Sequence, residues 1–484
     1  MWLFSLCALL GLLCAPKCSA TPLDDYVYKA DPTYKYEIID TTEGPGYTLY
    51  TINMTSQTWK PDLQSQPVWW HYLSVTVPDK IDLQNAGFLF IDGGSNHNGP
   101  PSQTDTFVEL TTIVAVTTNS IGANLKMIPN QPITFKADPI QKSRSEDAII
   151  AWTWKTFVDQ KGADPEILLR MPMTKAGVRA LDTVNDLVNK KRNLTVDRFL
   201  VAGASKRGWT TWTVGAVDKR VVAIAPIVMD LLNMVPNLHH YYRALGGWTF
   251  AFDDYYALNF TEDLDNPYIK QMATIIDPIS YNDRYENKPK YITSTGGDEF
   301  FMIDDSKYYY NELKGPKYLR MVPNAEHSLA GHEISLLFGI RAFYLSVMKG
   351  KPLPKIEWKL NTTSTGGKIS LTADSTPQTV HCYHATTLDG KRKDFRLIRG
   401  TPGDPSKPQV HPVIWKTQYV TPTGALSWEV EFKNPEVGWT AFFIQVTFPG
   451  LEDSVLEFTT QTLIIPDTDP FPDCHDAGCR GTLV

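Results

Sequence analysis

The stretch Arg198-Phe-Leu-Val-Ala-Gly-Ala-Ser-Lys-Arg-Gly208 decides the predicted fold. Its first half is a short apolar run, typical of a strand buried on both faces, and a helical pattern follows over Lys206–Val217. Ser205 stands between them, where a nucleophile elbow presents a serine hydroxyl above a sheet. The usual pattern is Gly-x-Ser-x-Gly, and here Arg207 takes the place of the second glycine, with Gly208 one residue later.

The same alternation of apolar runs and helical patterns extends from about residue 60 to 350. Such alternation predicts right-handed crossovers and a mainly parallel sheet. An aromatic-rich segment at about 229–280 interrupts it and is interpreted either as a helical cap over the sheet or as an ordinary helical excursion that buries aromatic residues. The expected strands are 86–91, 112–116, 198–202, 221–228, 290–294 and 318–322, and the expected helices are 146–159, 175–189, 206–217, 305–313 and 333–349.

Three chemically distinctive residues follow predicted strands in the order Ser205, Asp298, His327. The carboxyl ends of parallel strands carry the ligand-binding loops of open α/β folds, and this order is that of α/β-hydrolases. His327 would take the serine proton, and Asp298 would orient the imidazole and stabilise its charged form. Asp230 is a fallback acid, whereas Asp304 and Asp305 are expected at a helix start, where an aspartate is more often a cap.

An oxyanion would need two preorganised donors. We expect them at the backbone N–H of Lys206 and in the loop that carries Gly93 and Gly94. Cations such as Lys206 and Arg207 at a helix N-terminus oppose the helix dipole. Their charge would either attract an anionic substrate group or pair with a nearby carboxylate, and pairing is the favoured interpretation.

The pattern of alternating strands and helices ends at Lys351-Pro-Leu-Pro354. About eight short runs separated by turn residues predict a β-sandwich. The expected organisation is therefore a signal peptide at 1–20, an α/β-hydrolase core with its cap at 21–352, and a β-sandwich domain at 353–484. Tryptophans of the last unit would fill its core or, less plausibly, bind carbohydrate; they are Trp358, Trp415, Trp428 and Trp439.

The N-terminus indicates export. Trp2–Leu13 has the length of a signal-peptide apolar region, and Cys18-Ser-Ala20 resembles a cleavage site. Cleavage would leave three of the six cysteines, with Cys474 and Cys479 as the expected disulfide pair and Cys382 unpaired. Four Asn-x-Thr sequons support glycosylation in a secreted, extracellular protein, at Asn53, Asn193, Asn259 and Asn361.

Composition excludes several classes of protein. The chain of 484 residues is 42% hydrophobic and 20% charged, which is ordinary for a globular protein and unlike a disordered one. Its net charge of −7 offers no basic field for nucleic acid. No apolar run in the body is long enough to span a membrane, and no metal or cofactor motif is evident.

Several further segments resemble the PhoPQ-activated pathogenicity-related protein family, whose eukaryotic members include autocrine proliferation repressors. The resemblance covers nearly the whole mature chain and implies an α/β-hydrolase core, with Ser205, Asp298 and His327 at the triad positions. For repressor-type members it implies extracellular signalling that slows proliferation, together with a dipeptidyl-peptidase-like activity. The segments are Phe90–Ser95, Ile128–Pro132, Ser145–Trp154, Gly203–Trp209, Tyr281–Tyr285, Val322–His327, Phe471–Cys474 and Gly481–Val484.

Two functions from different classes are consistent with these observations. The first is a secreted serine hydrolase, peptidase-like or esterase-like, acting on a small-molecule or peptide substrate. The second is an extracellular signal that binds a cell-surface receptor and uses the hydrolase fold as a scaffold without needing catalysis.

Overall fold

The structure is a computed structural model that describes residues 20–484. The predicted signal peptide therefore lies outside the described residues, apart from Ala20. Within the described part of the chain, no helix is long and apolar enough to cross a membrane.

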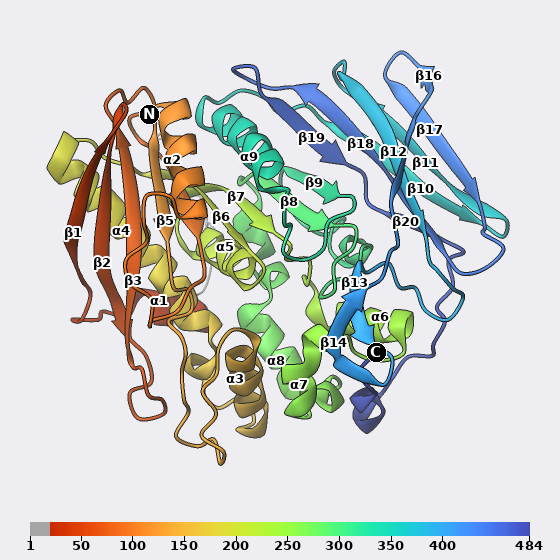
Figure 1. The fold of residues 1–484 in the computed structure, drawn as a ribbon, viewed down its shortest axis with the longest axis horizontal. Coiled ribbons are helices and arrows are strands. Elements are labelled where there is room, and N and C mark those ends of the chain that lie inside the picture. The colour runs from red at the N-terminus through yellow and green to blue at the C-terminus, as the bar shows by residue number, and fades with distance from the viewer. Residues whose placement is uncertain (1–19) are drawn as a thin grey trace, which may run out of the picture.

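A central sheet organises the molecule (Figure 1). Its first nine strands run in the order β1-β2-β3-β5-β4-β6-β7-β8-β9, and the six from β5 to β9 in this order are mutually parallel. The exchange of β4 and β5 and the antiparallel β3 are features of the α/β-hydrolase fold, which the chain adopts. The strands are β1 (Lys35–Gly44), β2 (Tyr47–Thr58), β3 (Val68–Pro78), β4 (Ala86–Ile91), β5 (Ile121–Leu125), β6 (Arg198–Ala204), β7 (Val221–Ile227), β8 (Lys290–Thr295) and β9 (Lys317–Val322).

Helices cover both faces of this sheet because successive side chains of a buried strand point to opposite sides. Leu89 and Ile91 of β4 belong to the core cluster under α3, α4 and α5, whereas Phe88 and Phe90 belong to the cluster under α2 and α9. The helices outside the cap are α1 (Pro22–Tyr28), α2 (Thr106–Thr118), α3 (Asp147–Asp159), α4 (Arg170–Arg192), α5 (Lys206–Val217) and α9 (Glu333–Met348).

Two sequence-based expectations in this region are wrong. The apolar run at 112–116 is helical, in α2, and the strand is its successor β5. Asp105 caps α2 by accepting hydrogen bonds from the N–H groups of Phe107 and Val108, and this local signal outweighs the β-propensity of the run. The predicted helix at 305–313 is only a 3-10 turn, Asp305–Tyr308.

The interruption after β7 is a helical cap. It contains α6 (Met234–Leu245), α7 (Asp253–Ala257) and α8 (Pro267–Ile276). The C-terminal tail packs on this cap: the N–H of Trp248 donates to Thr482 O, and its indole N–H donates to Cys479 O, at 2.9 Å each. The predicted Cys474–Cys479 disulfide is present in that tail, and the free Cys382 is buried.

About the last quarter of the chain forms antiparallel sheets. Four strands in the order β19-β18-β12-β15 extend the central sheet, because β19 pairs with β9 through Thr459 and Leu319, and β20 pairs with β18. A separate sheet, β10-β11-β17-β16, packs against this extension, and the pair β13-β14 stands apart. The strands are β10 (Ile356–Thr363), β11 (Gly366–Ala373), β12 (Thr379–Thr386), β13 (Ile398–Thr401), β14 (Asp404–Val410), β15 (Lys416–Tyr419), β16 (Pro422–Gly424), β17 (Ser427–Lys433), β18 (Thr440–Pro449), β19 (Val455–Thr459) and β20 (Leu463–Ile465).

Candidate active site

Ser205 lies in a strained turn between β6 and α5. Its φ of 56° and ψ of −125° fall in a region that residues other than glycine rarely adopt, and such strain clusters at functional sites. A Cβ at Gly203 would lie 2.8 Å from Arg207 O, and one at Gly208 would lie 2.9 Å from Ile227 O. The tight packing therefore requires glycine at 203 and 208 and leaves position 207 free for a long side chain.

A hydrogen-bond chain joins the three predicted residues. His327 Nε2 lies 2.8 Å from Ser205 Oγ, and His327 Nδ1 lies 2.9 Å from both carboxylate oxygens of Asp298. Asp298 is itself held by the N–H groups of Phe300 and Phe301, which donate to its Oδ1 at 2.7 and 3.1 Å. This arrangement of nucleophile, base and oriented acid is the one that acyl transfer requires.

Electrostatics around His327 favour its protonated form. Burial alone would lower the pKa of the imidazole, but the charge and hydrogen bond of Asp298, together with the charge of Glu299, outweigh burial and the pKa is raised. The negative charge of Glu299 adds to this effect, and Glu299 Oε2 accepts a hydrogen bond from the backbone N–H of His327 at 3.1 Å. Burial and the charge of Asp298 raise the pKa of Glu299 to about 7. Glu299 was not predicted as a site residue, although it directly follows Asp298.

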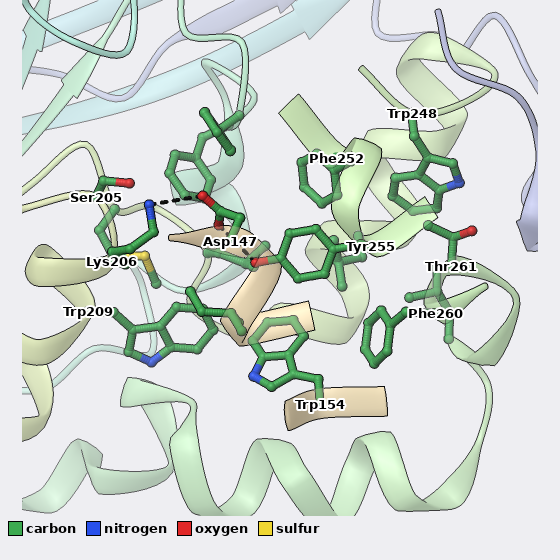
Figure 2. A pocket seen from close by; sticks show the side chains of 17 residues that line it. Asp147, Trp154, Ser205, Lys206, Trp209, Trp248, Phe252, Tyr255, Phe260 and Thr261 are labelled. Carbon is green, nitrogen blue, oxygen red and sulfur yellow. Dashed lines mark hydrogen bonds and ion pairs between the residues drawn. The ribbon is translucent and has the colours of Figure 1, made fainter. Parts of the chain in front are cut away.

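A largely apolar pocket opens beside Ser205 (Figure 2). Its walls come from α3, from the first turns of α5, from the cap and from the segment after β8. Phe300 of that segment also packs against His327, with the rings tilted and their centroids 4.4 Å apart. The cap therefore contributes directly to the surface that faces the nucleophile, as Trp248, Phe252, Tyr255 and Phe260 show.

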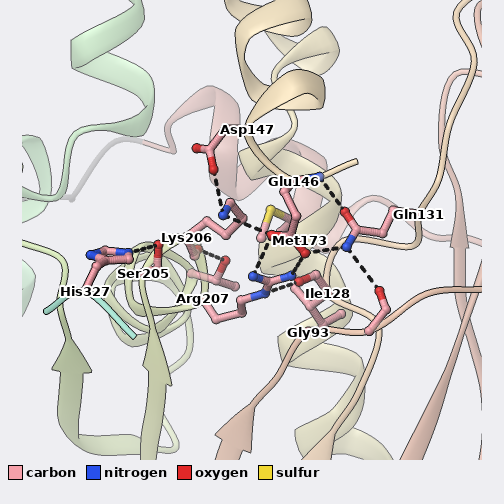
Figure 3. A network of polar contacts seen from close by, with 12 residues as sticks. Gly93, Ile128, Gln131, Glu146, Asp147, Met173, Ser205, Lys206, Arg207 and His327 are labelled. Carbon is pink, nitrogen blue, oxygen red and sulfur yellow. Dashed lines mark hydrogen bonds and ion pairs between the residues drawn. The ribbon is translucent and has the colours of Figure 1, made fainter. Parts of the chain in front are cut away.

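The two cations at the start of α5 are paired with carboxylates (Figure 3). Arg207 binds Glu146 through both terminal nitrogens, at 2.7 and 2.6 Å. Lys206 Nζ lies 2.9 Å from Glu146 and 2.9 Å from Asp147. Although burial opposes ionisation, Arg207 and Lys206 hold the pKa of Glu146 well below its usual range. The favoured interpretation of these cations as salt-bridged is thus what the structure shows.

Glu146 is a second strained residue beside the site. Its φ of 53° and ψ of −125° nearly equal those of Ser205, and its N–H donates to Gln131 Oε1 at 2.7 Å. Arg207 Nε also donates to Ile128 O at 2.5 Å. The loop that carries Ile128 and Gln131 and the loop that carries Glu146 are thereby tied to the elbow. In the sequence, the Ser145–Trp154 segment is marked only by its resemblance to the family, and no local pattern indicates a role for Glu146 or Asp147.

The predicted oxyanion loop lies near the elbow. A Cβ at Gly93 would meet the Arg207 guanidinium at 2.8 Å, and Gly94 has a φ of 129°. The Gly93 N–H donates to Asp92 Oδ1 at 2.6 Å, so in this state that donor is engaged. Asp92 is in turn paired with Lys126 at 2.8 Å.

The rival acids have other partners. Asp230 accepts from Tyr309 and from Ser294, and burial raises its pKa to about 6. Asp304 accepts from Lys307 at 2.7 Å and is 2.8 Å from His240. Ligand atoms of His240, Asp304 and Asp305 lie within 4.8 Å of one another, close enough for a metal ion, but the Lys307 ammonium already supplies a positive charge there.

Sequence comparison then assigns the family. The family model described as PhoPQ-activated pathogenicity-related protein matches residues 23–396. The chain belongs to this family. A curated relative, autocrine proliferation repressor protein A of Dictyostelium discoideum, is 38% identical over 475 residues, which cover 96% of this chain and 94% of the relative. The predicted membership of the PhoPQ-activated pathogenicity-related proteins is confirmed.

The solved structures that match this chain are less similar in sequence than the curated relative. Acetyl xylan esterase 1 from Thermoanaerobacterium sp. JW/SL YS485 matches with a TM-score of 0.44 and 14% identity, covering 67% of this chain and 93% of the esterase. A glucuronoyl esterase from Solibacter usitatus matches with a TM-score of 0.40 and 13% identity, covering 66% and 86% of the two chains.

The predicted glycosylation sites differ in exposure. Asn193, Asn259 and Asn361 are exposed, whereas Asn53 on β2 is half-buried. Of the four tryptophans considered for carbohydrate binding, Trp415, Trp428 and Trp439 are buried in the core clusters.

Proposed function

We propose that this protein is a secreted serine hydrolase in which Ser205, His327 and Asp298 form the catalytic triad. The observation that carries the proposal is the continuous hydrogen-bond chain from Ser205 Oγ through the imidazole to the Asp298 carboxylate. The strained turn at Ser205 supports it, because the fold maintains an unfavourable backbone conformation at the nucleophile.

The reaction follows from this geometry. Ser205 Oγ attacks the substrate carbonyl carbon while His327 Nε2 accepts its proton. The backbone N–H of Lys206 and the Gly93-Gly94 loop would stabilise the oxyanion, with the Gly93 N–H contributing only after its hydrogen bond to Asp92 is released. The bond to the leaving group then breaks, and the imidazolium returns the proton to the departing alcohol or amine. Water, deprotonated by His327, hydrolyses the acyl-serine, and the acid is released with Ser205 protonated again.

Ester substrates fit the site better than peptides bound through a free amino terminus. An aminopeptidase-type site needs an unpaired carboxylate for the substrate ammonium. Asp253, considered for this role, is exposed, and Asp254 lies 3.4 Å from Lys142. Asp147 faces the pocket but binds Lys206 and accepts from Tyr255 at 3.0 Å. We therefore rank ester hydrolysis first and dipeptidyl-peptidase-like activity second.

Labelling with a fluorophosphonate probe tests the proposal. The wild-type protein should be labelled, and Ser205→Ala should not. Ser102→Ala changes an exposed serine away from the elbow and should be labelled like the wild type. An unlabelled wild type, or equal labelling of Ser205→Ala, would contradict the assignment.

A second candidate function is extracellular signalling without catalysis. The observation that favours it is the 38% identity to a relative named as a proliferation repressor. Purified wild type and Ser205→Ala, with matched circular dichroism spectra, would be added to cultured cells. Equal effects on proliferation would support a scaffold that binds a cell-surface receptor, and loss of the effect in the mutant would contradict it.

A further inference from the structure

The pocket beside Ser205 is small and is lined mainly by aromatic and aliphatic side chains. Its volume is about 50 Å³ (Figure 2). Trp154 and Ile150 of α3 and Trp209 of α5 form one side, and Phe252, Tyr255 and Phe260 of the cap form the other. Packing among these rings fixes its shape, since the Trp154 ring centroid lies 5.3 to 5.6 Å from those of Trp209, Tyr255 and Phe260.

This volume limits what the pocket holds. An apolar protein cavity of about 150 Å³ accommodates benzene, and one water occupies about 30 Å³ of liquid. A pocket one third of the benzene-binding size has room for about two carbons, neither a ring nor a long chain. An acetyl group would leave part of it unfilled, and the unfilled lining would lose its dispersion contacts.

The charged groups on the wall cancel one another. Lys206 is bridged by Glu146 and Asp147, and the Tyr255 hydroxyl donates to Asp147. A carboxylate or an ammonium group on the substrate would find no unpaired partner among these charged groups of the pocket wall. Burying such a charge without a partner is costly. The lining therefore selects an uncharged, apolar group.

We propose that this pocket is the specificity site of the enzyme, and that it selects esters carrying an unbranched apolar group of about two or three carbons beside the scissile carbonyl. The inference rests on the proposed hydrolase function. The group is either the acyl chain or the alkyl chain of the alcohol, because both are attached at the carbonyl that Ser205 would attack.

Two ester series distinguish these sources. The first varies the acyl chain from acetyl to octanoyl with p-nitrophenol as the common leaving group, and the second varies the alcohol from methyl to octyl with a common acetyl group. In one series kcat/KM should peak at about two or three carbons beyond the ester group, that is at propionyl to butyryl or at ethyl to propyl. It should fall about tenfold or more on either side, because each methylene in a fitted apolar pocket changes discrimination by such factors. A flat profile in both series, or an optimum at acetyl or octanoyl, would overturn the proposal.

Variants of Ile150 test whether the optimum in chain length is set by this pocket. Ile150→Ala should move the optimum to a chain longer by one or two carbons, and Ile150→Phe should move it toward acetyl. Leu336→Ala is the matched control, since Leu336 lines a second apolar cavity of about 80 Å³ between α2 and α9 that Ser205 does not line. Equal shifts in the Leu336 and Ile150 variants would contradict the assignment.

A binding measurement separates failure of this inference from failure of the hydrolase function. Absence of turnover on every ester would contradict the hydrolase. Butyramide, acetamide and octanamide would then be compared on folded Ser205→Ala by saturation-transfer NMR. Strongest saturation of butyramide, reduced in Ser205→Ala/Ile150→Phe, would support the pocket, and stronger saturation of acetamide or octanamide would overturn it.

Discussion

At the residue scale, two acidic side chains that carry no triad role shape the site. Glu299 binds the backbone of His327 and contributes negative charge beside the imidazole. Glu146 neutralises Lys206 and Arg207 at a helix start where the dipole disfavours cations. One residue adjusts the base, and the other makes two cations tolerable beside the nucleophile.

Glu299→Gln should move the pH profile of kcat/KM to lower pH. Activity requires neutral His327, so it rises as pH increases through the pKa of the imidazole, which the structure raises above its ordinary 6.5. The Glu299 carboxyl has a pKa of about 7, so only its ionised fraction raises the imidazole pKa and its removal should lower that pKa modestly. The Gln amide oxygen can still accept from the backbone N–H of His327. The midpoint of the acidic limb is the measurement, with the exposed Glu312→Gln as control. An upward or absent shift would contradict the role.

Glu146→Gln should lower the free energy of unfolding by about 1 to 2 kcal/mol. Loss of the carboxylate leaves Arg207 and Lys206 with fewer counter-charges, but the Glu146 side chain is 39% exposed and solvent moderates the cost. Urea denaturation measures the change. Glu109→Gln, at an exposed position of α2, should change it by less than about 0.5 kcal/mol.

At the scale of elements, the C-terminal tail acts as a clamp on the cap. Trp248 exchanges backbone hydrogen bonds with Thr482 and Val484, and its ring lines the pocket. The disulfide fixes the tail segment whose Cys479 carbonyl accepts from the Trp248 indole. The position of Trp248 in the pocket wall therefore depends on a segment more than two hundred residues later in the sequence.

The double change Cys474→Ser/Cys479→Ser should loosen the cap without unfolding the sheet. Because the constraint on the tail is lost, amide hydrogens of α6 and of the Trp248 loop should exchange faster, whereas those of β6 and β7 should keep their protection. Hydrogen exchange followed by mass spectrometry measures both regions. Uniform acceleration over the whole chain, or none in α6, would show that the tail is not a local clamp.

At the scale of the whole molecule, the C-terminal strands and the hydrolase core share one interior. β19 continues the central sheet beyond β9, and Phe458 packs against Tyr318 and Tyr291, with ring centroids 4.7 and 6.0 Å apart. The core cluster of α2 and α9 also includes Phe442 and Ile444 of β18. The sequence boundary near 352 is thus crossed by a continuous sheet and a continuous apolar core.

A chain ending at Pro352 should fail to give a soluble monomer. Its β9 edge would be unpaired, and apolar surface on Tyr291, Tyr318 and Phe343 would be exposed, which favours aggregation. Expression of residues 21–352 beside 21–484, followed by size-exclusion chromatography, tests this. A monomeric, cooperatively folded 21–352 would mean that the core does not need the later strands.

The sequence by itself determined that Ser205, Asp298 and His327 follow strands in this order, because short-range patterns fix where strands end and the chain order at those ends identifies the fold. It also indicated the cap and the disulfide. Only the tertiary structure decided the rest. It showed that Glu146 neutralises the cations from 61 residues away in sequence. It joined β19 to β9 and closed a small pocket between α3, α5 and the cap. These features depend on contacts between segments distant in sequence, and the local pattern of residues does not encode which of them meet.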